Sequence, residues 1–455
     1  MKTDRVILVE FNELSPVLLD QFMAVGDLPS FRRFHDESVV YTTDAEASQP
    51  NLEPWIQWPT VHLGVSYQEH GIRHLGDEDS AHRPIAELLS AAGHRVGICG
   101  SMNVPHRQVN GFSIPDPWNS AAPTLPEWLA PFHHTVSTMV QESSRDGKAS
   151  QRDTGLVAFA RLMIRHGLSA ETVLKVVGQL ASEQRDPGMR WRRATMLDRL
   201  QYDLFRNLVG RSHARFATFF SNSTAHLQHY FWRNMNPTEF QTPPDGTEHE
   251  SLKNAVRYGY MSMDRLLQRF MADFPDALLV LCTALSQEAW RDSTKVTYRP
   301  RDFESLLDFA ELSGEGVTVQ PVMAEEFVVR FPTEAAALHG AAQFARLRVA
   351  GEPLLSFVNK GTYLVGGCSI GDAGSATSSI EKAGSANGRQ VGDLFYPIHT
   401  VRSGRHNPHG ALWWRTGEHR VVEDSVPLMA IAPTILSLFD VETPSYMSGP
   451  QLQLQ

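Results

Sequence analysis

Short apolar runs rich in β-branched residues recur along the chain, each joined to a turn and an amphipathic helix. The first, VILVEF at residues 6–11, is followed by NELSPVLLDQFM, which has the pattern of a turn and a helix. Similar runs come at residues 95–99, 215–220 and 277–282. Runs that are apolar at successive positions are typical of strands buried on both faces of a parallel sheet. The alternation predicts an α/β protein with a doubly wound, mostly parallel sheet.

The chain is 455 residues long, and we expect one large α/β core with insertions. Residues 122–213 have helical periodicity and few strand patterns, which predicts a helical insertion. Residues 301–390 predict a small α/β subdomain followed by a flexible surface loop, because the stretch at 371–388 is rich in Gly, Ala and Ser and poor in apolar residues. The core is expected to consist of the remaining segments, residues 1–121, 214–300 and 391–455.

The net charge of the chain bears on its partners. With 41 Lys and Arg against 51 Asp and Glu, the formal net charge is -10. A chain with this charge repels polyanions over long range, so a nucleic-acid partner is not expected. The local basic cluster of Arg190, Arg192 and Arg193 is interpreted as a solvated helix face rather than as a phosphate-binding patch.

Cysteine spacing and hydropathy indicate the compartment. Cys99, Cys282 and Cys368 lie far apart and form no CxxC motif, so we expect free, mostly buried thiols and no cysteine-rich zinc module. The first apolar run is too short for a signal peptide, and no segment approaches the ~20 apolar residues that a membrane span needs. We therefore expect a cytoplasmic protein with no membrane partner.

Seven segments carry a family resemblance through their sequence and their order. They are VILVEFNELSPVLLD, LPSFRRFHDES, HLGVSYQEHGI, AELLSAAGHRVGICGSMNVP, AHLQHYFW, SGRHNPHGALWWRTG and APTILSLFDVETPSYMSG. In this order they resemble the alkaline phosphatase superfamily, most closely its type I phosphodiesterase and nucleotide pyrophosphatase branch. The resemblance implies a sheet of the alkaline phosphatase type, two zinc ions held by three aspartates and three histidines, and a Thr or Ser nucleophile.

We matched the family's functional positions to this sequence one by one. At the first metal ligand and at the nucleophile, this chain has residue types that differ from those of the family. The first aspartate falls on Asn12, a neutral amide. The nucleophile falls on Pro54 or on Leu52, depending on which neighbouring motif sets the alignment. Neither side chain can attack phosphorus, so we expect the nucleophile to be water or a group of the substrate.

The remaining metal-ligand positions are only partly kept. The family's Asp-x-x-x-His pair falls on Ala225 and His229, its Asp-His pair on Ala284 and Leu285, and its final histidine on His406. With neutral residues at all three carboxylate positions, two dications would lack the anions that offset their repulsion, so a two-metal centre is not expected. His229 and His406 remain candidate ligands for at most one divalent metal, zinc or manganese.

Polar residues beside these positions are candidates for a rebuilt site. We predict Glu53 or Glu13 as a general base, because a carboxylate beside tryptophans can have a raised pKa. Asn12 and His62 are further catalytic candidates. The candidate substrate-binding residues are Trp55, Gln57, Trp58, Thr283, Ser286, Gln287 and His226.

Some of these candidates also fit structural roles. His226 fits a hydrogen-bonded structural histidine, and the two tryptophans fit packing in the core. Ligands of open α/β sheets bind beyond the carboxyl ends of the strands. The residues expected to converge at that edge are Asn12, Glu53, His229, Thr283 and His406.

Two functions of different classes remain open. The leading one is a divergent enzyme of the alkaline phosphatase type, acting on a phosphorylated, nucleotide-linked or otherwise anionic small molecule. The alternative is a catalytically inactive family member that binds a ligand or a protein partner. Zinc or manganese bound at His229 and His406 would favour the enzyme.

Overall fold

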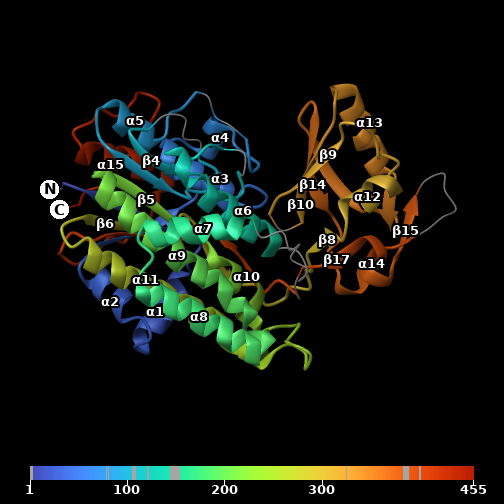
Figure 1. The fold of residues 1–455 in the computed structure, drawn as a ribbon, viewed down its shortest axis with the longest axis horizontal. Coiled ribbons are helices and arrows are strands. Elements are labelled where there is room, and N and C mark those ends of the chain that lie inside the picture. The colour runs from blue at the N-terminus through green and yellow to red at the C-terminus, as the bar shows by residue number, and fades with distance from the viewer. Residues whose placement is uncertain are drawn as a thin grey trace.

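The computed structural model describes the chain except for residues 1–3, 78, 80, 105–108, 120–121, 144–153, 324, 383–388, 399–400 and 455. Two lobes are visible in Figure 1. The larger lobe carries both termini, and the smaller lobe contains helices α12 (Phe303–Phe309), α13 (Glu334–Ala345) and α14 (Val391–Leu394).

The larger lobe is built on a mixed, mostly parallel sheet. In the part of the chain that the structure describes, this sheet has nine strands in the order β20-β2-β19-β6-β1-β5-β3-β4, with β21 paired to β2. Strand β1 pairs in parallel with β5 and β6, whereas β19 runs antiparallel between β2 and β6. The predicted fold class is therefore confirmed. The strands are β1 (Val6–Phe11), β2 (Val39–Asp44), β3 (Val96–Cys99), β4 (Gly111–Ile114), β5 (Phe216–Ser221), β6 (Leu278–Cys282), β19 (His409–Trp414), β20 (Arg420–Val421) and β21 (Val426–Pro427).

Both faces of this sheet are covered by helices, which explains why its central strands are apolar at successive positions. Ile7 and Val9 of β1 face one core, while Val6 and Leu8 face the other, and all four are fully buried. Each buried side chain of this size contributes about 1.5–3 kcal/mol. The first core is covered by α1 (Pro16–Ala24), α2 (Pro29–Asp36), α9 (Arg193–Ser212), α10 (Ser223–Met235) and α11 (Ala255–Asp273), and the second by α3 (Pro54–Leu63), α5 (Ile85–Ala91) and α15 (Ile431–Leu438).

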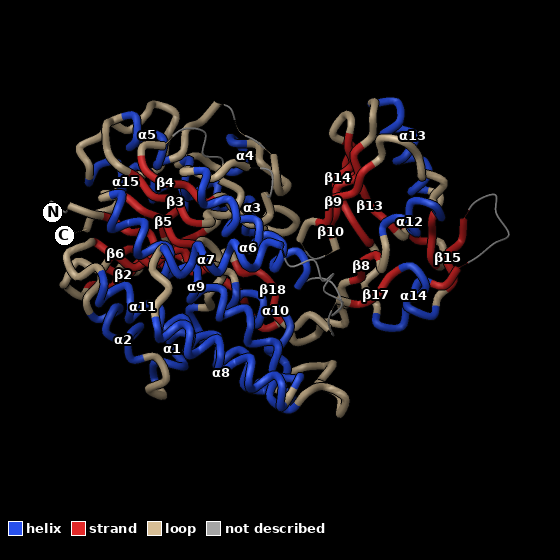
Figure 2. Tube along the Cα trace, in the orientation of Figure 1, coloured by secondary structure: helices blue, strands red, loops and turns tan. Residues whose placement is uncertain are grey.

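The described part of residues 122–213 is helical, as the blue helices of Figure 2 show. It contains α6 (Ala130–Ser143), α7 (Thr154–Arg165), α8 (Ala170–Arg185), the 3₁₀ helix η2 (Pro187–Arg192) and α9. Leu204, Phe205 and Leu208 of α9 belong to the core beneath the sheet, so this segment packs directly on the larger lobe.

In the part of the chain that is described, the smaller lobe has a core of its own between two four-stranded sheets and helices α12, α13 and α14. Pairing of β8 (Tyr298–Pro300) with β17 (Phe395–Pro397) brings residues on both sides of 301–390 into this lobe. The other strands are β9 (Thr318–Pro321), β10 (Glu326–Arg330), β11 (Leu347–Val349), β12 (Glu352–Pro353), β13 (Leu355–Asn359), β14 (Tyr363–Cys368), β15 (Ser379–Lys382) and β16 (Arg389–Gln390).

Residues 371–388 were predicted to form a flexible loop, but part of this segment has regular secondary structure. It contains the 3₁₀ helix η5 (Ala373–Thr377) and strand β15. The sequence pattern was misleading because one apolar side chain, Ile380, is buried in the core of the smaller lobe and anchors the strand. Residues 383–388 lie outside the described residues.

The three cysteines are free and buried, as the sequence predicts. Cys99 and Cys282 are the last residues of β3 and β6, and Cys368 is the last residue of β14. Among the described residues, no helix has both the length and the apolar composition needed to cross a bilayer.

Candidate active site

The site is built at the carboxyl edge of the central sheet, where three neighbouring parallel strands end. Two backbone hydrogen bonds hold the turn after β1: Asn12 N–H donates to Ser221 O at 3.0 Å, and Glu13 N–H donates to Thr283 O at 3.2 Å. Glu13 has a φ of 60° and Ala284 a φ of 57°, in the left-handed region that side chains other than glycine disfavour. Strained backbone of this kind clusters at functional sites.

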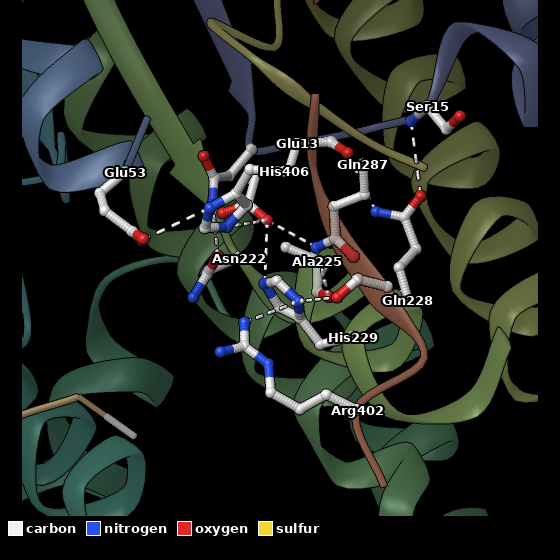
Figure 3. A network of polar contacts seen from close by, with 12 residues as sticks. Glu13, Ser15, Glu53, Asn222, Ala225, Gln228, His229, Gln287, Arg402 and His406 are labelled. Atoms are coloured by element: carbon white, nitrogen blue, oxygen red, sulfur yellow. Dashed lines mark hydrogen bonds and ion pairs between the residues drawn. The ribbon is translucent and has the colours of Figure 1, made fainter. Parts of the chain in front are cut away.

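Glu13 lies at the centre of a buried polar network (Figure 3). Its Oε2 lies 3.1 Å from His229 Nε2 and 3.3 Å from His406 Nε2. The same oxygen accepts a hydrogen bond of 2.5 Å from Gln287 Nε2, and Oε1 accepts one of 2.7 Å from Asn12 Nδ2. With 2% of its surface exposed, Glu13 is a carboxylate surrounded by donors.

The two histidines come from different elements and face each other across Glu13. His229 lies on α10, and His406 lies on β18 (Gly404–Asn407), which pairs with β7 (Ser286–Ala289). Their ring centroids are 5.1 Å apart. Among the described residues, the buried Nε2 atom of His406 makes no hydrogen bond, although Glu13 is close by.

The second nitrogen of each ring has its own contacts. His229 Nδ1 lies 3.0 Å from Gly404 O and 3.1 Å from Arg402 Nη2. These two contacts require different tautomers. Gly404 O accepts only if the proton is on Nδ1, which leaves the Nε2 lone pair free for a metal. Arg402 can only donate, so its contact requires Nδ1 to accept and places the proton on Nε2, facing Glu13. His406 Nδ1 lies 3.4 Å from Glu53 Oε2.

Burial and charge shift the pKa values of Glu13, Glu53, His229 and His406. Burial alone would raise the pKa of Glu13, but the charge of His406 and the close contacts with both histidines hold it well below its usual value. Burial and Arg402 lower the pKa of His229 to about 4. Burial opposes the charged form of His406, yet Glu53 and Glu13 raise its pKa. Burial raises the pKa of Glu53.

The group formed by Glu13, His229 and His406 fits a divalent metal. One ligand atom from each residue lies within 4.8 Å of the others. Ligands about 2.1 Å from a tetrahedral zinc ion are roughly 3.4 Å apart, close to the observed contacts of 3.1 and 3.3 Å. One carboxylate and two imidazoles are a known donor set of catalytic zinc sites, and among the described residues the buried Nε2 of His406 has the contact with Glu13 but no hydrogen bond.

The expected carboxylate positions are filled by neutral side chains in the structure. Asn12 is buried, and its Oδ1 accepts a hydrogen bond of 2.7 Å from Trp58 Nε1. Ala225 lines the cavity above the site. Ala284 and Leu285 are fully buried and belong to the apolar core. The buried carboxylate in contact with both histidines is therefore Glu13, one residue beyond the position that the family resemblance indicated.

Four of the five residues expected to converge do so: Asn12, Glu53, His229 and His406. Thr283 is close in the backbone, but its Oγ1 accepts a hydrogen bond of 2.8 Å from Ala411 N–H. The hydroxyl of Thr283 therefore binds the backbone of β19.

Other predicted substrate-binding residues divide into cavity-lining and structural groups. Trp55 and His226 line the cavity. Gln57 is fully buried and donates to Asn51 O, and Ser286 donates its hydroxyl to His409 O.

Several candidates lie behind the cavity wall. Trp58, Gln57, Thr283, Ser286 and Gln287 are not among the described residues that line the cavity. Trp58 and Gln287 act on the site indirectly, by hydrogen bonds to Asn12 and Glu13.

His62, predicted as a catalytic candidate, lies in a separate buried pair. Its Nε2 is 2.6 Å from Glu10 Oε1, and both side chains have no exposed surface. Side chains alternate along a strand, so Glu10 and Phe11 of β1 face opposite sides of the sheet. The pair is thus part of the interior rather than of the described cavity lining.

A cavity of about 1280 Å³ opens above Glu13. Its lining comes from the larger lobe, from the helices of residues 122–213 and from the smaller lobe. Sequence reasoning missed several of its polar residues, among them Arg402, Asn222 and Asp198. Two sequence features pointed to them: Asn222 directly follows a predicted strand at the carboxyl edge, and Arg402 lies in the same short segment as His406, just before β18.

Comparison with known proteins gives structural likenesses only. No protein family and no curated protein matches the chain. Among solved structures, alkaline phosphatase PafA is similar over 99% of this chain and 98% of its own, at 11% identity and a TM-score of 0.49. Murine ectonucleotide pyrophosphatase/phosphodiesterase 5 has 10% identity and a TM-score of 0.41 over 97% and 96% of the two chains. Phosphonoacetate hydrolase from Sinorhizobium meliloti 1021, in complex with phosphonoacetate, has 10% identity and a TM-score of 0.40 over the same shares. Likenesses at this level assign neither an activity nor a ligand to the chain.

Proposed function

We propose that this chain is a divergent enzyme of the alkaline phosphatase superfamily that binds one divalent cation and acts on a phosphoryl-type group of an anionic small molecule. The observation that carries the proposal is the convergence of Glu13, His229 and His406 on one point of the carboxyl edge, at the floor of a large cavity. The family's first aspartate, its Asp-x-x-x-His motif and its last histidine all map to this place.

Glu13, His229 and His406 would hold the cation, and zinc or manganese suits this donor set. A bound ion of this kind supplies Lewis acidity for an oxygen of the substrate. Gln287 and Asn12 orient Glu13 by donating to its two oxygens. Supporting bonds of this type fix the direction of a metal-binding carboxylate.

Glu53 is the proposed general base. It is the residue before α3, its side chain is 20% exposed, and it lines the cavity beside His406. Burial raises its pKa above the usual value of a carboxylate, which makes it a stronger proton acceptor. Glu53 would take a proton from water or from a hydroxyl of the substrate onto its carboxylate. It would then give that proton to the leaving oxygen or to water, which restores the carboxylate.

No hydroxyl side chain is available at the family's nucleophile position. That position falls on Pro54 or on Leu52, depending on the alignment. Thr60, the next hydroxyl residue along the chain, is buried with its Oγ1 3.2 Å from His70 Nε2. The proposed reaction therefore uses a nucleophile that enters the cavity, with Arg402 beside His229 offsetting negative charge of the substrate.

The proposal is tested by metal content and turnover together. The purified full chain is stripped with a chelator, reloaded with Zn²⁺ or Mn²⁺, and assayed against p-nitrophenyl phosphate, bis-p-nitrophenyl phosphate and p-nitrophenyl sulfate. We expect about one bound ion per chain, lost in His229→Ala and in His406→Ala, and turnover that requires it.

A matched control comes from the surface cluster of His35, Asp36 and His419, whose ligand atoms also lie within 4.8 Å of one another. His419→Ala should leave the tightly bound ion and the turnover unchanged. Retention of the ion in both His229→Ala and His406→Ala, or full turnover after stripping, would contradict the proposal.

The second candidate function is a ligand-binding protein without catalysis. It is favoured by the loss of the family's nucleophile, because neither Pro54 nor Leu52, the two alternative residues at that position, has a side chain that can attack. An ion bound at the site, together with no turnover on any of the three esters, would support this alternative.

A further inference from the structure

Asn222 occupies a position where an asparagine normally caps a helix, yet its side chain does not do so. It lies between β5 and α10 and is the N-cap residue of α10, but its side chain makes no capping hydrogen bond. Asparagine is favoured at this position because its side-chain oxygen accepts from the backbone of the first turn. Here the side chain is turned toward Asn12 and the cavity instead.

The direction of the Asn222 amide follows from its neighbours. The indole Nε1–H of Trp58 can only donate, so the atom of Asn12 that it meets at 2.7 Å is the oxygen Oδ1. The other atom of that amide is Nδ2, which donates to Asn222 Oδ1 and to Glu13 Oε1, each at 2.7 Å. Asn222 therefore has its oxygen in the network and its nitrogen directed away from it (Figure 3).

The nitrogen of Asn222 is a donor that faces the cavity. Asn222 lines the cavity, and among the described residues no group accepts a hydrogen bond from its Nδ2. Its amide lies beside the Glu13 carboxylate, because both accept from the same nitrogen of Asn12.

We propose that Asn222 is a ligand-binding residue that donates its Nδ2 hydrogen to an oxygen of a tetrahedral anion of the phosphate class held above Glu13. Trp58 and Asn12 are positioning residues that fix the polarity of this amide. The class of ligand rests on the proposed function, whereas the polarity of the amide rests on the network alone.

The proposal gives a chemical meaning to the neutral residue at position 12. A carboxylate at that position would have only acceptors to offer. Asn222 would then turn its Nδ2 toward that carboxylate and present Oδ1 to the cavity. An acceptor in this place repels an anion, so the amide of Asn12 is the feature that makes Asn222 a donor.

Inorganic phosphate is the probe for this inference, titrated calorimetrically into the full chain with and without one equivalent of Zn²⁺. A hydrogen bond to a charged group predicts that Asn222→Ala weakens phosphate binding by about 10- to 100-fold. Asn222→Asp should weaken it at least as much, because the new carboxylate repels phosphate. Zn²⁺ affinity should change little in Asn222→Ala.

Asn12→Asp separates this mechanism from a merely structural effect. It should weaken phosphate binding while Zn²⁺ binding stays the same or tightens, since it adds an anion near the ion. Asn236→Ala, at the other end of α10, is the control and should bind phosphate like the wild type. Thermal unfolding of each variant checks that it is folded.

The outcomes distinguish this inference from the proposed function. Phosphate binding that depends on Asn222 but not on Zn²⁺ would support the inference and contradict the metal. Wild-type phosphate affinity in Asn222→Ala, or a wild-type chain that binds no phosphate, would overturn the inference even if Zn²⁺ binds as proposed.

Discussion

Replacing Glu13 by glutamine keeps the shape of the side chain but exchanges one acceptor oxygen for a donor. Both oxygens of Glu13 face N–H groups of fixed direction. Asn12 Nδ2 is fixed by Trp58, and Gln287 Nε2 is fixed because it also donates to Ala225 O at 3.0 Å. Whichever way the new amide turns, its NH₂ group meets another donor.

The size of the effect follows from burial. A hydrogen bond to a charged group contributes about 1.5–3 kcal/mol, and a buried donor left without an acceptor costs about 1–3 kcal/mol. With relaxation of the site, Glu13→Gln should lower the free energy of unfolding of the metal-free chain by roughly 2–4 kcal/mol. If Glu13 also binds the ion, a second loss follows, since a ligand at 100 times its dissociation constant stabilises the folded state by about 2.7 kcal/mol.

The assay is chemical and thermal unfolding of wild type and Glu13→Gln, in EDTA and in excess Zn²⁺. Glu288→Gln is the control, because Glu288 pairs with Arg405 at the surface and such pairs contribute about 0–1 kcal/mol. Equal stability of Glu13→Gln and wild type in EDTA would refute the reasoning about fixed donors. An equal rise of the unfolding midpoint with Zn²⁺ in both proteins would refute the assignment of Glu13 as a ligand.

Three further perturbations have defined outcomes. Gln287→Ala removes the donor to Glu13 Oε2 and should weaken Zn²⁺ binding by about 10- to 100-fold, as loss of a supporting bond typically does, measured by competition with a chromogenic chelator. Glu53→Gln should abolish the acidic limb of the pH profile of kcat with little change in bound Zn²⁺; an unchanged profile would exclude Glu53 as the base. Burial raises the pKa of Asp198 from 3.8 to about 6, so the wild type loses stability as pH rises through this range, whereas Asp198→Asn should not. Between pH 4 and pH 8, the free energy of unfolding of Asp198→Asn, measured in urea, should rise by about 2–3 kcal/mol relative to that of wild type. A difference between the two free energies that does not change with pH would argue against a buried, ionising Asp198.

The central sheet was predictable because its residues carry the pattern locally. The four apolar runs at residues 6–11, 95–99, 215–220 and 277–282 correspond to β1, β3, β5 and β6. Each is buried on both faces, so composition alone marks it. The smaller lobe was harder to outline, because its strands are short and its β8–β17 pair joins segments nearly 100 residues apart.

The site was predictable in its location but not in its chemistry. His229 and His406 meet as the family resemblance implied. Glu13 contacts both histidines, and its backbone has a left-handed conformation that no local sequence pattern predicts. Thr283 and Ser286 follow the correct strand, but their hydroxyls form hydrogen bonds with the backbone of residues 409–411. Those bonds depend on the tertiary structure, so the local sequence does not predict them.

The charges at the site favour one ion over two. Two dications 4 Å apart would repel by roughly 16 kcal/mol at an effective dielectric constant of 20, four times the value for unit charges. The carboxylates in contact with the two site histidines, among the described residues, are Glu13 and Glu53, which balance a single dication. A second ion would meet the amide of Asn12 and the apolar side chain of Ala284 instead of anions. A second equivalent of Zn²⁺ should therefore bind only when Asn12→Asp and Ala284→Asp are introduced together, and a wild-type chain that holds two ions would contradict this account of the site.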